Sequence, residues 1–325
     1  MSALAKAVVW AGSRGAAHRL LILTYHRVLP ARDSQLRGDP SAEEFDTQVA
    51  TLKSRFNVVR LDVGLERLRA GTLAPASVAL TFDDGYADNH DVALPILRKH
   101  GATATFFIAN GYLDGRRMWN DTVIESVRRL NRPSISLAEL DTALATEQLP
   151  LGSADQRYAT TQKIIDTIKH FDPARREAIT TRLKELAATP LPDDLMMTSD
   201  KVRGLHSAGM LIGAHTVHHP VLTAVEPGVA EREIAAGRAG LAEIIGEPVR
   251  FFAYPNGRPG RDYDRRHVDI VRKLGFDAAV STAHGFAGAH SEFAQLPRVA
   301  AWSTKPWHLT AQLLKALREP QTQSA

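Results

Sequence analysis

Two short segments, one acidic and one rich in histidine, contain the residue types that a catalytic metal site requires. The acidic segment is TFDDG at positions 81–85, which lies where an apolar, strand-like run ends. Adjacent acids at a strand end point in different directions, so one of Asp83 and Asp84 can bind a metal ion while the other faces a bound water. Asp-Gly is also common in turns, and a purely structural acidic turn is the alternative.

The histidine-rich segment is HTVHH at positions 215–219. His215 and His219 are four residues apart, and one helical turn would place both imidazoles on the same face. Two imidazoles and one carboxylate leave open positions on zinc, which is typical of a catalytic site. A partly exposed histidine cluster is the alternative, since the chain contains 13 histidines. His218 is expected to face outward or to support the ligands from outside.

Both segments follow predicted strands of one alternating pattern, in which short apolar runs rich in β-formers alternate with segments of helical period. This alternation predicts a mostly parallel sheet, either closed into a barrel or open and doubly wound, with functional groups at the carboxyl ends of its strands. The sequence has no glycine-rich dinucleotide fingerprint and no P-loop. The predicted strands cover 20–25, 77–82, 102–109, 210–214, 249–254 and 278–281, and the predicted helices cover 45–56, 91–100, 231–245 and 264–274.

The pattern divides the chain into an N-terminal segment at residues 1–19, a main domain at 20–317 and a flexible polar tail at 318–325. Within the main domain, residues from about 113 to 192 interrupt the alternation and are predicted to form a helical insertion over one end of the sheet. The insertion contains a helix at 158–171 and a second helix that Asp172 caps and Pro173 begins.

Composition excludes several classes of protein. The 325 residues are 44% hydrophobic and 23% charged, which is typical of a globular chain. The absence of cysteine excludes disulfides and thiolate metal sites, so a metal must be bound by histidine and carboxylate. The net charge is +4, without any run of Lys or Arg that would indicate a nucleic-acid surface.

The N-terminus lacks the pattern of a signal peptide, because Arg14, His18 and Arg19 interrupt the apolar run at 3–12 too early. No stretch of about 18 to 20 apolar residues could span a membrane. These features predict a cytoplasmic protein, with peripheral membrane association as the alternative.

Three motifs in a fixed order carry a family resemblance. TFDDG, then HTxxH followed by Pro220, then RFFAYPNG at 250–257 resembles the first three motifs of the polysaccharide (NodB-like) deacetylases, carbohydrate esterase family 4. The resemblance extends from about residue 20 to 300, except for the insertion. It implies a deformed (β/α) barrel with a mononuclear Asp-His-His metal site.

The resemblance also implies roles for individual residues. Asp83 corresponds to the catalytic base, and Asp84, His215 and His219 correspond to the ligands of one divalent metal ion, expected to be zinc although other divalent ions are open. The oxyanion would be held by the metal and by a backbone N–H from Tyr254 or its neighbours, so Pro255 and Asn256 are candidates as well.

The chain departs from the commonest family pattern in two places. Ala253 occupies the position where many members have an arginine that orients the catalytic aspartate. The family's general acid is a leucine-spaced histidine near the C-terminus, and none of His284, His290 and His308 lies in such a motif.

Two residues elsewhere offer replacements. LTYHRV at 23–28 resembles the YHR-type segment of deacetylases from exopolysaccharide biosynthesis loci, in which a histidine from the first strand enters the site. His26 is therefore the candidate general acid or oxyanion partner, with a satisfied structural histidine as the alternative. Arg298 could supply the missing positive charge near Asp83, and a surface arginine after Pro297 is the alternative.

The segment MWND at 118–121 joins an aromatic ring to an amide and an acid, a combination suited to a sugar-binding wall. Similar WND-like segments occur in the exopolysaccharide relatives. For Trp119 we favour the simpler interpretation that its ring anchors the insertion to the barrel. Asp121 remains a candidate substrate contact.

Together these features favour a metal-dependent hydrolase that removes the N-acetyl group from an N-acetylhexosamine of a polysaccharide or its precursor. A related amidohydrolase or an O-acetyl esterase would need the same metal site. A catalytically silent glycan-binding barrel is the alternative outside enzymology. The expected partner is an N-acetylated glycan or its precursor, and the sequence indicates neither the sugar nor the oligomeric state.

Overall fold

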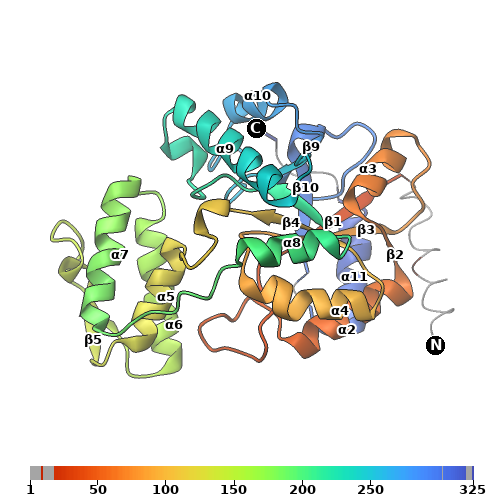
Figure 1. Cartoon of the computed structure of the whole chain (residues 1–325). Helices are drawn as coiled ribbons and strands as arrows, with labels where there is room; N and C mark the ends of the chain where they lie inside the picture. Colours follow the sequence, from red (N-terminus) through yellow and green to blue (C-terminus); the bar gives the residue numbers. More distant parts are fainter. Residues whose placement is uncertain (1–8, 10–17, 302, 320–323) are drawn as a thin grey trace.

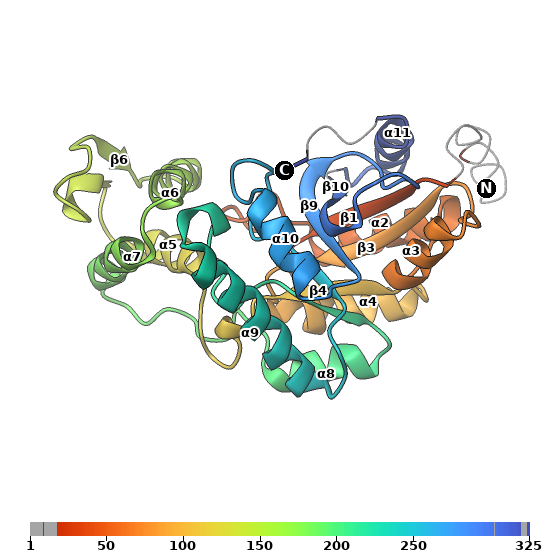
Figure 2. The same cartoon turned by 90° about the horizontal axis from the view of Figure 1, so that it is seen from above.

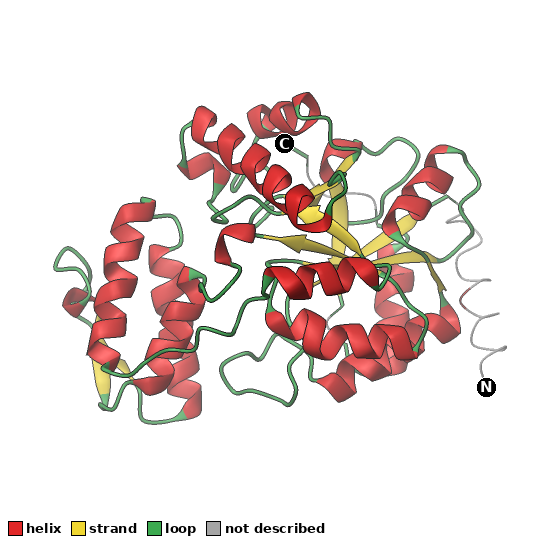
Figure 3. Cartoon of the chain, viewed as in Figure 1, coloured by secondary structure: helices red, strands yellow, loops and turns green. Residues whose placement is uncertain are grey.

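A seven-stranded barrel forms the centre of the computed structural model, which describes residues 9, 18–301, 303–319 and 324–325 (Figures 1 and 3). Around the barrel the strands follow the order β1-β10-β9-β8-β7-β4-β3, and β3 pairs again with β1. All these pairings are parallel, so the carboxyl ends of the strands meet at one rim. The strands are β1 (Leu20–Tyr25), β3 (Ser77–Phe82), β4 (Ala104–Ile108), β7 (Leu211–Ala214), β8 (Phe251–Ala253), β9 (Ala278–His284) and β10 (Leu296–Ala300).

The pairing of β1 with β3 closes the barrel through six aligned residue pairs, from Leu20 opposite Ser77 to Tyr25 opposite Phe82. A short additional strand, β2 (Asn57–Val58), pairs with the start of β3. The predicted barrel is therefore confirmed, and the alternative of an open, doubly wound sheet is excluded.

Helices surround the barrel, as the view from above shows (Figure 2). They bury its outward-facing side chains. A row of stacked aromatic rings connects three neighbouring strands near the candidate site. The ring of Phe82 stacks on Tyr25 at 5.2 Å and on Phe106 at 4.8 Å between centroids. The surrounding helices are α2 (Ala42–Arg55), α3 (Leu61–Arg69), α4 (Leu94–Lys99), α8 (Ser199–Ser207), α9 (Pro227–Ile245), α10 (Arg265–Lys273) and α11 (Pro306–Ala316).

A second hydrophobic cluster fills the inside of the barrel. It contains the strand residues that alternate with the outward-facing ones and point inward. Leu20 and Ile22 of β1 lie in it with residues from β3, β4, β8, β9 and β10. Leu61, Leu65 and Leu68 of α3 join the same cluster, so α3 closes the amino-terminal end of the barrel. The apolar interior leaves the carboxyl rim as the end at which polar side chains gather.

A helical lobe stands beside the barrel and has a hydrophobic cluster of its own (Figure 1). Ser153 caps its second helix, and Asp172 caps the third, whose first residue is Pro173 as predicted. Ile164, Ile179 and Leu183 lie in the buried centre of the lobe. Its elements are α5 (Trp119–Arg129), the hairpin of β5 (Ser134–Ser136) and β6 (Gln148–Pro150), α6 (Ala154–Ile168) and α7 (Pro173–Ala187).

The predicted helices differ from the observed ones mainly at their ends. Helix α9 begins at Pro227, four residues before the predicted start, and ends at Gly246 with φ +73° as expected. The segment predicted as one helix at 91–100 consists of a π-helical turn at Asn89–Ala93 followed by α4. Most of the N-terminal segment at 1–19 and residues 320–323 of the tail lie outside the described residues. Within the described part of the chain, no helix is long and apolar enough to cross a membrane.

Candidate metal centre and active site

The acidic segment bends sharply where β3 ends, and the bend separates the directions of its two carboxylates. The N–H of Asp83 donates to the Tyr25 carbonyl at 3.0 Å, which continues the pairing of β1 with β3 by one residue. Asp84 then adopts φ +77° and Gly85 φ +95°. A left-handed aspartate costs on the order of 1–3 kcal/mol and persists only where its surroundings hold it. Here the Asp84 carbonyl accepts a bond from the Ala109 N–H at 3.2 Å.

The histidine segment is not helical, so the helical turn predicted to pair His215 with His219 is wrong. Instead, Thr216 has φ +64° and His219 has φ +51°. The Thr216 hydroxyl accepts a hydrogen bond from the His219 N–H at 3.0 Å and closes a tight turn. This turn brings the two rings to 4.7 Å between centroids. The predicted pair forms, but through a left-handed turn that follows β7.

Helix α9 holds this turn from outside. Its Glu233 carboxylate accepts hydrogen bonds from the N–H groups of Val217 and His218 at 3.0 and 2.8 Å, and lies 2.8 Å from His218 Nδ1. A Cβ at Gly237 would lie 2.7 Å from the carbonyl carbon of Thr216, so only glycine allows this approach. His218 faces outward, with its side chain 58% exposed, as predicted.

Asp84, His215 and His219 converge on one point, and their candidate ligand atoms all lie within 4.8 Å of one another. Asp84 Oδ1 is 3.4 Å from Nε2 of each histidine. His215 Nδ1 donates to the Ala253 carbonyl at 2.7 Å, which leaves its Nε2 free to bind a metal. Asp84 Oδ1 is buried without a hydrogen-bond partner among the described residues. These features fit a divalent cation, which would supply the missing partner.

The protonation states of Asp84 and His219 also suit metal binding. Burial raises the pKa of Asp84, but the neighbouring His215, His219 and His26 lower it by more. The resulting pKa lies well below the ordinary value of an aspartate. Burial lowers the pKa of His219 to about 3, which keeps its imidazole neutral. An ionised carboxylate and a neutral imidazole are the forms that bind a metal.

Asp83 lines the same cavity as these ligands and forms a buried ion pair with Arg298 of β10. The guanidinium donates to both carboxylate oxygens at 2.7 and 2.6 Å, and also to Thr81 Oγ1 and to the Ser281 carbonyl. Burial raises the pKa of Asp83, but the charge and hydrogen bonds of Arg298 outweigh burial and lower it below the ordinary value. Arg298 is thus buried and not at the surface, and it is the positive charge beside Asp83.

The acidic and histidine segments share a cavity of about 210 Å³. His26 lies at its edge, exposed, where the chain leaves β1. Asn89 holds this stretch by donating from its side-chain amide to the His26 carbonyl at 2.8 Å. The structure therefore brings the histidine of the first strand to the same cavity as the metal triad. The lining residues are His26, Asp83, Asp84, Met118, Trp119, Asn120, Ile165, Lys169, His215, His219, Tyr254, Asn256 and Thr282.

The predicted oxyanion donor at Tyr254 is wrong, because its backbone N–H already donates to the Val280 carbonyl at 3.1 Å. Its hydroxyl donates to the Ala294 carbonyl, and its ring stacks on Tyr263 at 3.9 Å. Pro255 has no N–H to donate. Asn256 is left as the candidate from this segment, since it lines the cavity and has φ +59°.

The WND segment divides between the cavity and the protein interior. Trp119 lines the cavity and packs against the core of the lobe, with the Arg176 guanidinium 4.9 Å from its ring. Asp121 is only 2% exposed and accepts a hydrogen bond from the Tyr86 hydroxyl at 3.2 Å. The structure therefore does not support Asp121 as a substrate contact, and its neighbour Asn120 reaches the cavity instead.

Sequence reasoning missed several residues that shape the site. Ile165 and Lys169, at the end of α6, form part of the cavity wall, and burial lowers the pKa of the Lys169 ammonium. Glu233 and Gly237 of α9 fix the histidine turn. None of the four lies in a motif, and only the placement of α6 and α9 against the barrel shows their positions.

Comparison with known proteins agrees with this geometry. A family profile described as polysaccharide deacetylase matches residues 70–136 and 155–279, which is more than half of the chain. No curated protein matches the chain.

Solved structures of deacetylases share the fold. The Streptococcus pyogenes deacetylase PplD in complex with acetate is 20% identical, with a TM-score of 0.59 over 93% of this chain and 99% of that one. IcaB from Ammonifex degensii is also 20% identical, with a TM-score of 0.57 over 91% and 97%. A de-N-acetylase from Aggregatibacter actinomycetemcomitans is 17% identical, with a TM-score of 0.56 over 86% and 94%.

The buried ion pair predicts a large stability effect. Arg298→Gln should lower the free energy of unfolding by about 3–5 kcal/mol, because Asp83 is left buried without a counter-charge. Chemical denaturation followed by circular dichroism measures the loss. Arg250→Gln, which breaks the exposed pair with Asp277, is the matched control and should cost at most about 1 kcal/mol. Equal losses in the two variants would contradict the prediction.

Proposed function

Because the chain belongs to the polysaccharide deacetylase family, we propose that it removes the N-acetyl group from an N-acetylhexosamine of a polysaccharide or its precursor. Members of this family are hydrolases that act on carbon–nitrogen bonds other than peptide bonds. One observation carries the proposal: an ionised carboxylate, Asp83, lies in the same cavity as an Asp-His-His triad. This arrangement places a proton acceptor next to a site for a divalent cation. It is the combination that amide hydrolysis by water requires.

In this proposal Asp84, His215 and His219 bind one divalent cation, with zinc as the expected ion. When bound, the cation polarises the acetyl carbonyl and makes water more acidic. The chain prepares its ligands in advance. The Ala253 carbonyl orients His215, the Thr216 turn positions His219, and the left-handed backbone at Asp84 turns its carboxylate towards both.

The remaining side chains move protons and hold charge. Asp83 accepts a proton from the attacking water, whose oxygen bonds to the acetyl carbon, and Arg298 keeps the carboxylate ionised and oriented. Asn256 is the candidate donor to the oxygen of the tetrahedral intermediate. The carbon–nitrogen bond then breaks and acetate leaves. His26 donates a proton to the departing amine.

The cavity favours a sugar as the group that carries the acetamide. Its wall combines the indole of Trp119 and the apolar Ile165 with the polar groups of Asn120 and Lys169. An apolar face together with a few directed polar groups is the usual composition of a small-molecule site. The cytoplasmic location expected from the sequence would suit an enzyme that acts on a precursor of the polymer.

Metal binding provides the first test. The purified wild-type chain should hold one divalent ion, and His215→Ala and His219→Ala should each lose it, since each removes one of three protein ligands. Inductively coupled plasma mass spectrometry measures the metal content per chain. His218→Ala is the matched control and should retain the ion, because this ring faces outward. Loss of the metal from the His218 variant alone would exclude the assigned triad.

The proposed base provides the second test. Asp83→Asn should lower kcat for acetate release from N-acetylated oligosaccharides by at least about 10²-fold while the metal stays bound, because Asn cannot accept the proton. A coupled assay of released acetate, together with metal analysis and circular dichroism, gives the result. A folded, metal-loaded Asp83 variant with wild-type turnover would refute the role of Asp83.

The role of His26 separates an amide from an ester substrate. An amine needs a proton in order to leave, whereas an alkoxide from an acetate ester needs it less. His26→Ala should therefore lower kcat for an N-acetyl substrate by about 10²- to 10⁴-fold and affect an O-acetyl ester much less. Acetate release from paired N-acetyl and O-acetyl sugars measures the difference. Equal losses on both substrates would assign His26 to binding and not to proton donation.

A further inference from the structure

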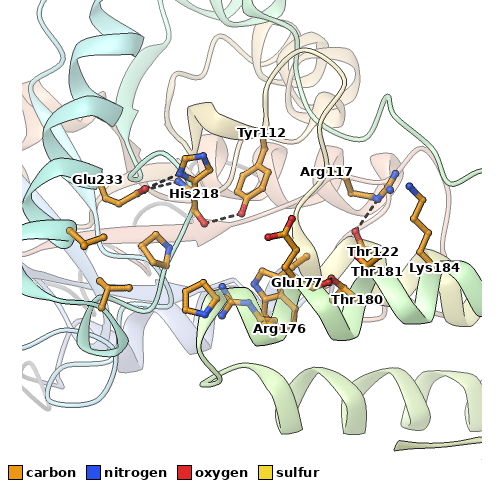
Figure 4. A pocket seen from close by; sticks show the side chains of 15 residues that line it. Tyr112, Arg117, Thr122, Arg176, Glu177, Thr180, Thr181, Lys184, His218 and Glu233 are labelled. Carbon is orange, nitrogen blue, oxygen red and sulfur yellow. Dashed lines mark hydrogen bonds and ion pairs between the residues drawn. The ribbon is translucent and has the colours of Figure 1, made fainter. Parts of the chain in front are cut away.

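A larger groove of about 540 Å³ lies between the helical lobe and the barrel (Figure 4). It adjoins the metal cavity, because Trp119 lines both. One wall is formed by α5, α7 and the segment before α5. The other is formed by α9 and the turn that carries His218. On α7 the lining residues recur at helical spacing, from Arg176 and Glu177 through Thr180 and Thr181 to Lys184. The polar face of α7 thus looks into the groove, while Ile179 and Leu183 face the core of the lobe.

The groove continues the metal cavity. Trp119 lines both spaces, and His218 in the groove is the chain neighbour of the candidate ligand His219. A glycan with one sugar at the metal can therefore extend past Trp119 into the groove. Tyr112, whose hydroxyl donates to the His218 carbonyl at 2.8 Å, adds a second aromatic ring to the wall.

Three cations line this groove without a carboxylate partner. Arg117 donates to Thr122 and to the Pro192 carbonyl, and Arg176 donates to the Lys169 carbonyl and packs over the Trp119 ring. Within the described residues neither these arginines nor Lys184 forms an ion pair. Burial lowers the pKa of both arginines, and the acids near them, Asp121, Glu125 and Asp193 for Arg117 and Asp172 for Arg176, offset the desolvation only in part.

The two acids of the groove do not neutralise these cations. Glu233 is occupied by two backbone N–H groups and the ring of His218. Glu177 carries the remaining negative charge. In Figure 4, Arg117 and Lys184 both lie toward the end of the groove that is farther from Glu233, and Arg117 donates to the Thr122 hydroxyl. Two cations at one end of the groove are donors suited to an oxyanion.

We propose that this groove is a second subsite, which binds a carboxylate or phosphate carried by the substrate next to the sugar that is deacetylated. The inference rests on the proposed deacetylase function and adds to it that the substrate is acidic. Lys184 and Arg117 contact the anion, and Arg176 with Trp119 forms the passage from the metal cavity. A neutral glycan would leave these cations without an ion-pair partner.

Binding to three probes tests the proposal without any need for turnover. Isothermal titration calorimetry on the full chain, treated with chelator, compares a hyaluronan hexasaccharide as the carboxylate probe, UDP-N-acetylglucosamine as the phosphate probe and neutral chitohexaose. At low salt at least one anionic probe should bind more tightly than chitohexaose. Lys184→Gln should weaken that probe by about two- to fivefold and leave chitohexaose unchanged, as expected for one exposed charge. The probe that responds identifies the anion.

Matched variants make the result decisive. Lys163→Gln removes the same charge from an exposed position of α6 that does not line the groove, and it should leave all three affinities unchanged. Glu177→Gln removes the competing acid and should tighten the anionic probe. Equal affinities for neutral and anionic probes, no binding of either anion, or an equal effect of Lys163→Gln would overturn the proposal. Failure of acetate release with charge-dependent binding intact would instead reject the deacetylase function.

Discussion

The buried ion pair between Asp83 and Arg298 connects the two parts of the barrel on which the site depends. Asp83 directly follows β3 and Arg298 lies in β10, and both strands pair with β1. A buried guanidinium and carboxylate are tolerated only as a well-bonded pair, so the charge of one fixes the place of the other. Arg298 also bonds Thr81 and the Ser281 carbonyl, which leaves the carboxylate little freedom to rotate.

A second constraint is the left-handed backbone that directs the metal ligands. Asp84, Thr216 and His219 all have positive φ, a conformation that costs free energy in residues other than glycine. Hydrogen bonds offset this cost: Ala109 holds the Asp84 carbonyl, and the Thr216 hydroxyl closes the histidine turn. Helix α9 completes the support from outside. Strain of this kind is common at functional sites, where it holds side chains in positions that regular structure does not provide.

The helical lobe forms walls of the site that the barrel does not provide. It has its own core, yet it contributes one wall of the metal cavity through Ile165 and Lys169 and one wall of the adjoining groove through α7. The barrel thus holds Asp83 and the candidate metal ligands, and the lobe adds walls to the spaces beside them. Such a division is usual in parallel barrels, where the strands are constant and the connections vary.

A family resemblance carried by three motifs implied the barrel, and the sequence by itself determined the strand–helix alternation, the acidic and histidine segments and the Asp172–Pro173 helix start. These depend on local periodicity and on residue type, which a single sequence displays. Only the tertiary structure decided that the histidines meet through a turn, that the Tyr254 N–H is occupied and that Asp121 is buried. It also decided that Arg298 pairs with Asp83 across 215 residues of chain. Such contacts arise from strand pairing and helix packing between distant segments, and no local pattern encodes them.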